Sequence, residues 1–87
     1  MDIQELRTQI DRIDNELVRL YRERMETARE IGRYKREHRL PVLDPERERK
    51  LLDRVGEAAG EEYRDDVRDL FSFLMARSRN WQEHDCK

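Results

Sequence analysis

The feature that most constrains the fold is an apolar stripe near the start of the chain. It consists of residues spaced alternately three and four apart, namely Ile3, Leu6, Ile10, Ile13, Leu17 and Leu20. This spacing marks one face of an α-helix, and it predicts a helix from about Asp2 to Glu37 with Asp2 as N-cap. Such a helix is roughly 50 Å long at 1.5 Å per residue. A single chain of 87 residues cannot cover it, so part of the stripe must pack against another chain or a returning helix, and dimerisation is the simplest solution.

A basic residue interrupts this stripe. The next position after Leu20 is Arg24, and Lys35 follows eleven residues later, about 20° away around the helix axis. Burying a charge costs free energy unless a group of opposite charge meets it. Two aligned cations on an apolar stripe therefore indicate a buried anion site. The alternative, which is the commoner one for a lone arginine, is that Arg24 reaches solvent or pairs with a carboxylate.

The spacing along this helix leaves room for a ligand between the two cations. Arg24 and Lys35 lie about 16 Å apart along the axis, and Ala28 and Gly32 between them are small. Arg7 lies roughly 25 Å from Arg24 on the same helix, so it reaches this gap only from an antiparallel partner chain. The plainer interpretation of Arg7 is a solvated flanking residue.

A proline marks the end of the long helix and the approach to a second one. Pro41 disfavours helical geometry at the residue before it, so residues 40–43 are expected to form a short extended linker. Asp44 is a suitable N-cap, and the sequence predicts the second helix from about 45 to 59. Gly60 is expected to end that helix.

The third helix is predicted from about 66 to 82, after a polar connection, with Asp66 as its N-cap. Residues 83–87 form a polar tail that we expect to be disordered. Its cysteine, Cys86, is the only one in the chain, so no intrachain disulfide is expected. No strand pattern is present, so the predicted fold class is all-α: a long, a short and a medium helix in a single domain over residues 1–87.

Polar residues also stand on the predicted inner faces of the second and third helices. Glu48 precedes Leu52 and Val55 at the spacing of one helix face, so it points inward rather than toward solvent. Ser78 and Gln82 continue the apolar row of the third helix at an interval of four. Each of them alone is ordinarily a satisfied core group or a fraying helix end. Together with the two cations of the long helix, they indicate a functional site.

Taken together, these residues resemble the all-helical class of chorismate mutases. The resemblance covers residues 6–82, and it is carried by the run from Leu6 to Asp14, Glu23-Arg24, Gly32, Lys35, Asp44-Pro45-Glu46-Arg47-Glu48, Ser78 and Gln82. No single piece is diagnostic, whereas the order and spacing of the set are specific. In that family three helices per chain intertwine into a homodimer with two sites, and each site uses one arginine from the partner.

The resemblance implies an isomerase that rearranges chorismate to prephenate in aromatic amino acid biosynthesis, with Arg7 contributed by the partner subunit. It also implies that Arg24 binds a substrate carboxylate, that Lys35 and Gln82 contact the ether oxygen, and that Glu48 holds the ring hydroxyl. The implied pocket is completed by Asp44, Arg47 and Ser78.

The implied reaction needs no reactive side chain. It is an intramolecular pericyclic rearrangement, so no nucleophile, general base, metal or cofactor is expected. The enzyme must clamp two carboxylates in the reactive conformer and supply positive charge where the breaking ether bond gathers negative charge. Because Gln82 donates from a neutral amide, we predict activity with little pH dependence between about pH 6 and 9.

Composition argues against other classes of partner. Charged residues make up 46% of the chain, yet the net charge is only -2 and the pI is about 5.7. Because the two signs are mixed, nucleic acid is not expected as a partner. No apolar run approaches the length of a membrane span and no signal-peptide pattern is present, so we expect a cytoplasmic protein that does not bind membranes.

Two other interpretations remain open. Isochorismate-pyruvate lyase has the same fold and also performs a pericyclic reaction with a lysine and two arginines, although the stretch from Asp44 to Glu48 looks more like the mutases. A non-catalytic helical dimerisation module is the alternative from a different class. Replacing Arg24 and Lys35 by leucine would then raise stability and cost no function. A mutase would lose its activity, so turnover discriminates between the two.

Overall fold

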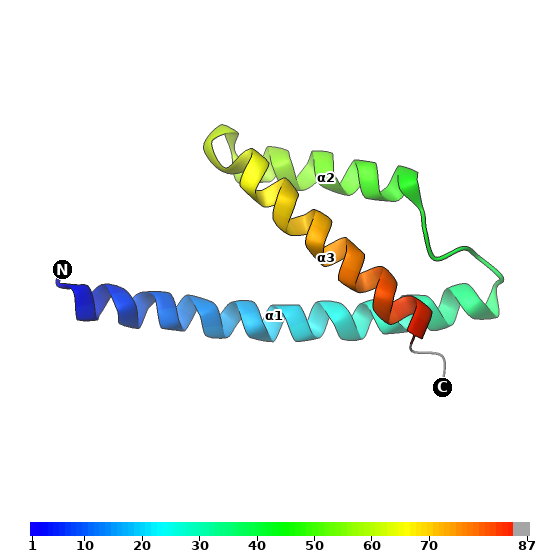
Figure 1. The fold of residues 1–87 in the computed structure, drawn as a ribbon, viewed down its shortest axis with the longest axis horizontal. Helices are drawn as coiled ribbons and strands as arrows, with labels where there is room; N and C mark the ends of the chain where they lie inside the picture. Colours follow the sequence, from blue (N-terminus) through cyan, green and yellow to red (C-terminus); the bar gives the residue numbers. More distant parts are fainter. Residues whose placement is uncertain (85–87) are drawn as a thin grey trace.

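The structure is a computed structural model that describes residues 1–84. Its elements are α1 (Ile3–Glu37), α2 (Pro45–Ala59), the short 3-10 helix η1 (Glu61–Tyr63) and α3 (Arg64–His84), shown in Figure 1. Residues 1–84 contain no strand. The predicted fold class, all-α with a long, a short and a medium helix, is confirmed.

Local signals fix both ends of α1. The Asp2 side chain accepts a hydrogen bond from the Glu5 backbone N–H at 2.9 Å, which caps the first turn as predicted. At the other end Arg39 adopts a left-handed backbone with φ 56°, and the Leu40 N–H donates to the Lys35 carbonyl at 2.7 Å. This pairing closes the last turn and directs the chain back toward α2.

The third helix differs from its prediction at both ends. It begins at Arg64 rather than at residue 66, so Asp66 lies in the first turn and is not the N-cap. The predicted polar connection is η1, in which the Tyr63 N–H donates to the Gly60 carbonyl at 3.2 Å. This turn leads directly into α3, whose N-terminal dipole favours the acidic first turn. Glu83 and His84, predicted to be disordered, continue the helix, and residues 85–87 lie outside the described part.

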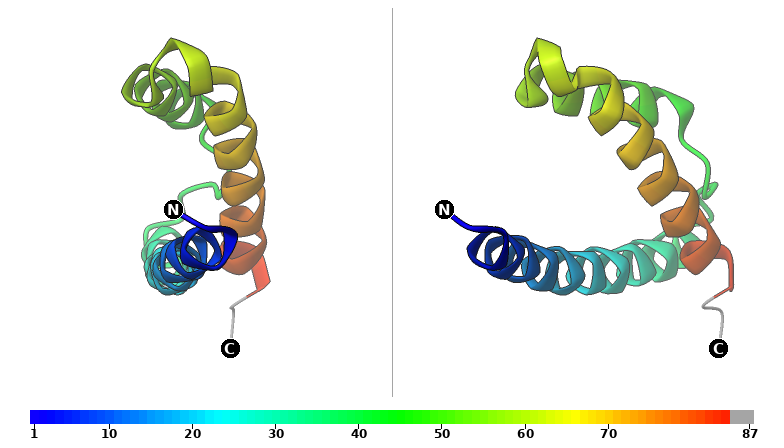
Figure 2. Two further views of the ribbon diagram at one scale, coloured as in Figure 1. Left: turned by 90° about the vertical axis from the view of Figure 1, so that its left-hand side faces the viewer. Right: turned by 60° about the vertical axis from the view of Figure 1, so that its left-hand side comes forward.

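The three helices form an open arch rather than a closed bundle. α2 and α3 make a hairpin, and the C-terminal end of α3 crosses the C-terminal half of α1 (Figure 1, Figure 2). α3 packs against both other helices, whereas no Cα atom of α2 lies within 8 Å of α1. The space between α1 and α2 is therefore bounded by α3 on one side and by the linker at one end.

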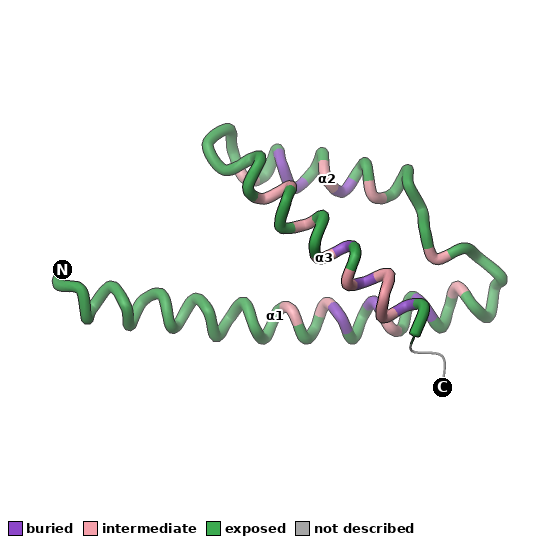
Figure 3. Tube along the Cα trace, in the orientation of Figure 1, coloured by how far each residue is buried: buried purple, intermediate pink, exposed green. Residues whose placement is uncertain are grey.

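The apolar core is small and lies along α3. Leu51, Val55 and Met75 form its centre between α2 and α3, and Met25 and Ala28 are buried on α1 where α3 crosses it. The N-terminal half of α1 is exposed along its length (Figure 3). The apolar stripe identified in the sequence keeps between 42% and 57% of its residue surface exposed, an area that one chain leaves available for a partner.

Candidate active site

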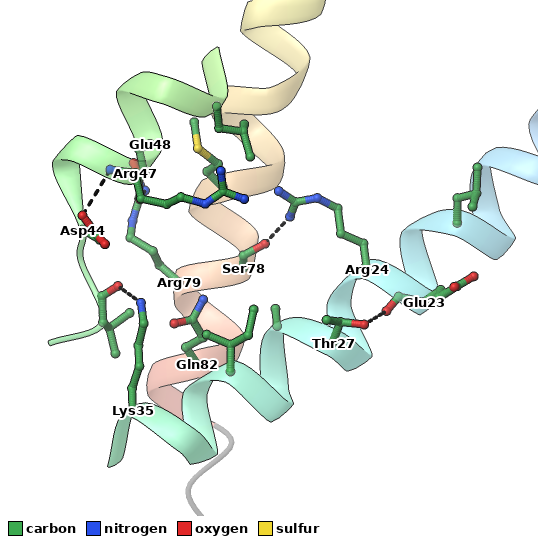
Figure 4. Close-up of a pocket in the computed structure, with 16 residues that line it drawn as sticks. Glu23, Arg24, Thr27, Lys35, Asp44, Arg47, Glu48, Ser78, Arg79 and Gln82 are labelled. Atoms are coloured by element: carbon green, nitrogen blue, oxygen red, sulfur yellow. Dashed lines mark hydrogen bonds and ion pairs between the residues drawn. The ribbon is translucent and has the colours of Figure 1, made fainter. Parts of the chain in front are cut away.

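A cleft of about 730 Å³ occupies the space between α1, the linker, α2 and α3 (Figure 4). This volume is in the range of small-molecule binding sites. Seven of the eight residues predicted to bind substrate line it, namely Arg24, Lys35, Asp44, Arg47, Glu48, Ser78 and Gln82. Because they come from all three helices and the linker, the fold brings together groups up to 58 positions apart in the chain.

Arg7 is the predicted residue that does not reach this cleft. It lies on the exposed N-terminal half of α1, beside Leu6 and Ile10. A separation of seventeen residues from Arg24 corresponds to about 26 Å along the helix. Within one chain, Arg7 therefore cannot contact a ligand held between α1 and α2.

Arg24 is a partly buried cation without an acidic partner. Its Nη1 donates to Ser78 Oγ, and its guanidinium carbon lies 5.8 Å from the centre of the Phe71 ring. Residues 1–84 provide no carboxylate within ion-pair distance of it. Burial, and then the nearby charge of Arg47, lower the pKa of Arg24. Both effects disfavour the cation, so a bound anion would relieve them.

Ser78 fixes the position of Arg24. The serine is buried, and its hydroxyl donates to the Leu74 carbonyl at 2.8 Å while it accepts from Arg24. The single hydroxyl proton is thus used within α3. Ser78 is arranged to hold the guanidinium across the cleft.

Two further predicted cations, Lys35 and Arg47, face the cleft from its far end and from α2. Lys35 Nζ donates to the Val42 carbonyl at 2.8 Å, which ties the end of α1 to the linker. Arg47 follows Asp44, whose carboxylate caps α2 by accepting from the Arg47 backbone N–H at 3.1 Å. The Arg47 side chain extends toward Arg24 (Figure 4). Neither Lys35 nor Arg47 forms an ion pair within residues 1–84.

Gln82 presents an amide at the base of the cleft. It is 8% exposed, and its Oε1 is buried without a hydrogen-bond partner in the described part of the chain. Its amide nitrogen points into the cleft (Figure 4). An unsatisfied buried oxygen of this kind costs about 1–3 kcal/mol in the isolated chain.

Gly32 allows α3 to approach α1 closely enough to place Gln82 at the base of the cleft. A Cβ atom at Gly32 would lie 2.8 Å from the Cα of Gln82 and 3.0 Å from its carbonyl oxygen. Gly32 itself does not contribute to the predicted gap, since the backbone of α3 fills the space beside it, although the cleft does lie between Arg24 and Lys35. Of the residues between the two cations, Thr27, Ala28 and Ile31 line the cleft.

The sequence matches the model of the chorismate mutase type II family over residues 6–83. The chain belongs to this family. The bifunctional chorismate mutase/prephenate dehydratase of Aquifex aeolicus is 44% identical over 54 residues, which cover 62% of this chain and 15% of that protein. The chorismate mutase of Methanocaldococcus jannaschii is 39% identical over 51 residues, which cover 59% of this chain and 52% of that protein. The matched segment thus spans at most about half of these relatives' length.

A solved structure has a similar fold over most of both chains. It is a conserved hypothetical protein from Pyrococcus furiosus, with a TM-score of 0.78 and 35% sequence identity, and the match covers 92% of this chain and 93% of that one. The three-helix arch is therefore shared by another protein of nearly the same length.

One cation that lines this chorismate mutase family cleft was not predicted as a site residue from the sequence. Arg79 lines the cleft, and its Nη1 lies 2.5 Å from Glu48 Oε2, with the two side chains 32% and 25% exposed. Its position four residues after Met75 and three before Gln82 marks it as part of the inner face of α3. That spacing was a usable signal.

Neither a metal centre nor a membrane span is found in the described residues. Residues 1–84 hold no group of three or more His, Cys, Asp or Glu side chains that could bind a metal ion. Among the same residues, no helix combines the length and apolar character needed to cross a membrane.

Proposed function

We propose that this chain is a chorismate mutase that rearranges chorismate to prephenate. The observation that carries the proposal is the convergence of Arg24, Lys35 and Arg47 on one cleft, each without an acidic partner in residues 1–84. Chorismate carries two carboxylates, which supply the missing negative charge. Membership of the family supports the same substrate.

The cleft acts first as a clamp. In the rearrangement the ether C–O bond breaks while a C–C bond forms within the same molecule, so the enzyme gains most by holding the compact conformer. Guanidinium groups suit this task because their planar forks bind carboxylates in a fixed orientation. Arg24, steadied by Ser78 and the Phe71 ring, binds one carboxylate from α1, and Arg47 adds positive charge from α2.

Lys35 and Gln82 act on the breaking bond. Lys35 uses one proton on the Val42 carbonyl and keeps two others for an acceptor in the cleft. The amide nitrogen of Gln82 is a neutral donor on a turn of α3 whose backbone packs closely against Gly32. Together they stabilise the negative charge that gathers on the ether oxygen, and preorganised donors of this kind are effective in partly buried sites. Glu48 accepts a hydrogen bond from the ring hydroxyl.

The complete site requires a second chain. The exposed apolar stripe on α1 is long enough to pair with its own copy in antiparallel orientation, which would close the arch and form an intertwined homodimer. That arrangement carries Arg7 of each chain toward the partner's cleft, where it completes the clamp. We place this dimer in the cytoplasm, where biosynthetic enzymes of this class act.

Turnover tests the proposal. Purified protein is mixed with chorismate, the loss of chorismate absorbance is followed, and the product is identified by NMR, with Lys35→Ala in parallel. Prephenate from the wild type and almost none from Lys35→Ala is the expected result. Release of pyruvate from isochorismate would instead assign the lyase reaction. If neither substrate is consumed, the chain is a dimerisation module and the proposal fails.

A further inference from the structure

We propose that Arg79 is a positioning residue that keeps Glu48 away from the cations that bind the substrate. This inference rests on the proposed mutase function and concerns the same cleft. It starts from an unusual composition: the cleft that is to bind a dianion also contains the carboxylate of Glu48. A carboxylate among unpaired cations binds one of them unless another partner holds it.

Arg79 is that partner. Its Nη1 binds Oε2 of Glu48 at 2.5 Å, across the gap between α3 and α2. Within residues 1–84 the other carboxylate oxygen, Oε1, has no hydrogen-bond partner. One oxygen is therefore fixed by the arginine, and the other remains free to accept a hydrogen bond from a substrate hydroxyl.

The ion pairs that Glu48 could otherwise form explain why its pairing with Arg79 matters. Glu48 shares the cleft with Arg24, Lys35 and Arg47. An ion pair between Glu48 and any of these would cancel a charge that a substrate carboxylate or the ether oxygen needs. The Glu48 and Arg79 side chains are 25% and 32% exposed, so solvent screens their attraction less than that of a surface pair.

Arg79 also links Glu48 to the rest of the site. It lies between Ser78, which holds Arg24, and Gln82, which points at the base of the cleft. The same turn of α3 thus sets the positions of Arg24, which binds a carboxylate, of Glu48, which accepts from the hydroxyl, and of the Gln82 amide. Moving that turn would shift all three together.

The test compares Arg79→Met, Arg79→Lys, Glu48→Gln and the double variant Arg79→Met/Glu48→Gln with chorismate as substrate. Arg79→Met is expected to lower kcat/KM by about 10- to 100-fold, mainly through a higher KM, because the released carboxylate occupies a substrate-binding cation. Arg79→Lys should recover much of the loss. The double variant should have a lower KM than Arg79→Met alone, since a neutral amide does not compete with the substrate.

A matched control variant distinguishes the positioning of Glu48 from a general effect of losing an ion pair between α2 and α3. Arg68 and Asp53 form another ion pair between α3 and α2, at 3.6 Å and outside the cleft. Arg68→Met should leave KM unchanged. Three results would each overturn the inference. The first is an equal rise in KM in Arg68→Met, the second is a KM in the double variant no lower than in Arg79→Met, and the third is an Arg79→Met variant with unchanged kinetics. Failure of the wild type to convert chorismate would overturn the proposed function, and this inference with it.

Discussion

Substitution of Gly32 by alanine tests the closest contact in the fold. The new Cβ would lie 2.8 Å from Gln82 Cα, 3.0 Å from its carbonyl oxygen and 3.1 Å from its Cβ. Carbon atoms in contact are normally about 3.5–4.0 Å apart. The obstructing atoms belong mainly to the backbone of α3, so the helix must move away by roughly 1 Å at this point.

The expected size of the effect follows from two opposing terms. Overpacking of this kind costs about 1–3 kcal/mol, while alanine gains about 1 kcal/mol over glycine inside a helix. We therefore expect Gly32→Ala to lower the free energy of unfolding by up to about 2 kcal/mol. Because the shift displaces Gln82 and Ser78, kcat/KM for chorismate should fall by about 10²-fold.

Gly56→Ala is the matched control. A Cβ at Gly56 would meet only flexible side-chain atoms, the Cγ of Arg64 at 3.2 Å and the Cδ and Cγ of Arg68 at 3.2 and 3.3 Å. Those side chains can move, so this variant should keep its activity and gain up to about 1 kcal/mol. Urea unfolding followed by circular dichroism measures the stability of both variants. The protein concentration is held fixed, because the stability of the proposed dimer would depend on it. Equal stability and activity in the two would refute the reasoning.

Three further results are expected. Arg24→Met should raise the melting temperature, because burial and the charge of Arg47 disfavour the cation and lower the pKa of Arg24. The same variant should lower kcat/KM by about 10²–10³-fold, and a lower melting temperature would contradict this reasoning. Gln82→Glu should donate only when its carboxyl is protonated, so its pH profile should fall as pH rises through that pKa while the wild type stays flat between about pH 6 and 9. Mixing Arg7→Ala and Lys35→Ala chains in equal amounts should restore about a quarter of the wild-type activity, because half of the dimers are mixed and each mixed dimer has one intact site. No recovery of activity in the mixed dimers would exclude Arg7 acting in trans.

Periodicity and end signals were enough to predict the three-helix class. The cap at Asp2, the cap at Asp44 and the stop at Gly60 are each made by groups adjacent in sequence, so local chemistry decides them. The start of α3 was missed because η1 runs directly into it. In that context Asp66 stabilises a first turn rather than capping it.

The site was harder to predict because its contacts are distant in sequence. Inward polar spacing identified Glu48, Ser78 and Gln82, but the partner of Glu48 is a residue on another helix. The role of Gly32 depends on where α3 crosses α1, which no periodicity in α1 encodes. Arg79 could have been found from its interval to Gln82, although charged residues are frequent in this chain and an arginine at such a position is ordinarily solvated.

The unfavourable features of the single chain share one explanation. Arg24 is a partly buried cation without an anion, Gln82 holds a buried oxygen without a donor within residues 1–84, and the stripe on α1 leaves large apolar side chains exposed. Each costs free energy in an isolated chain. A second chain would cover the stripe, and a bound dianion would neutralise the cations. The features that make this chain marginal alone are therefore those that a dimeric enzyme for a small dicarboxylate would use.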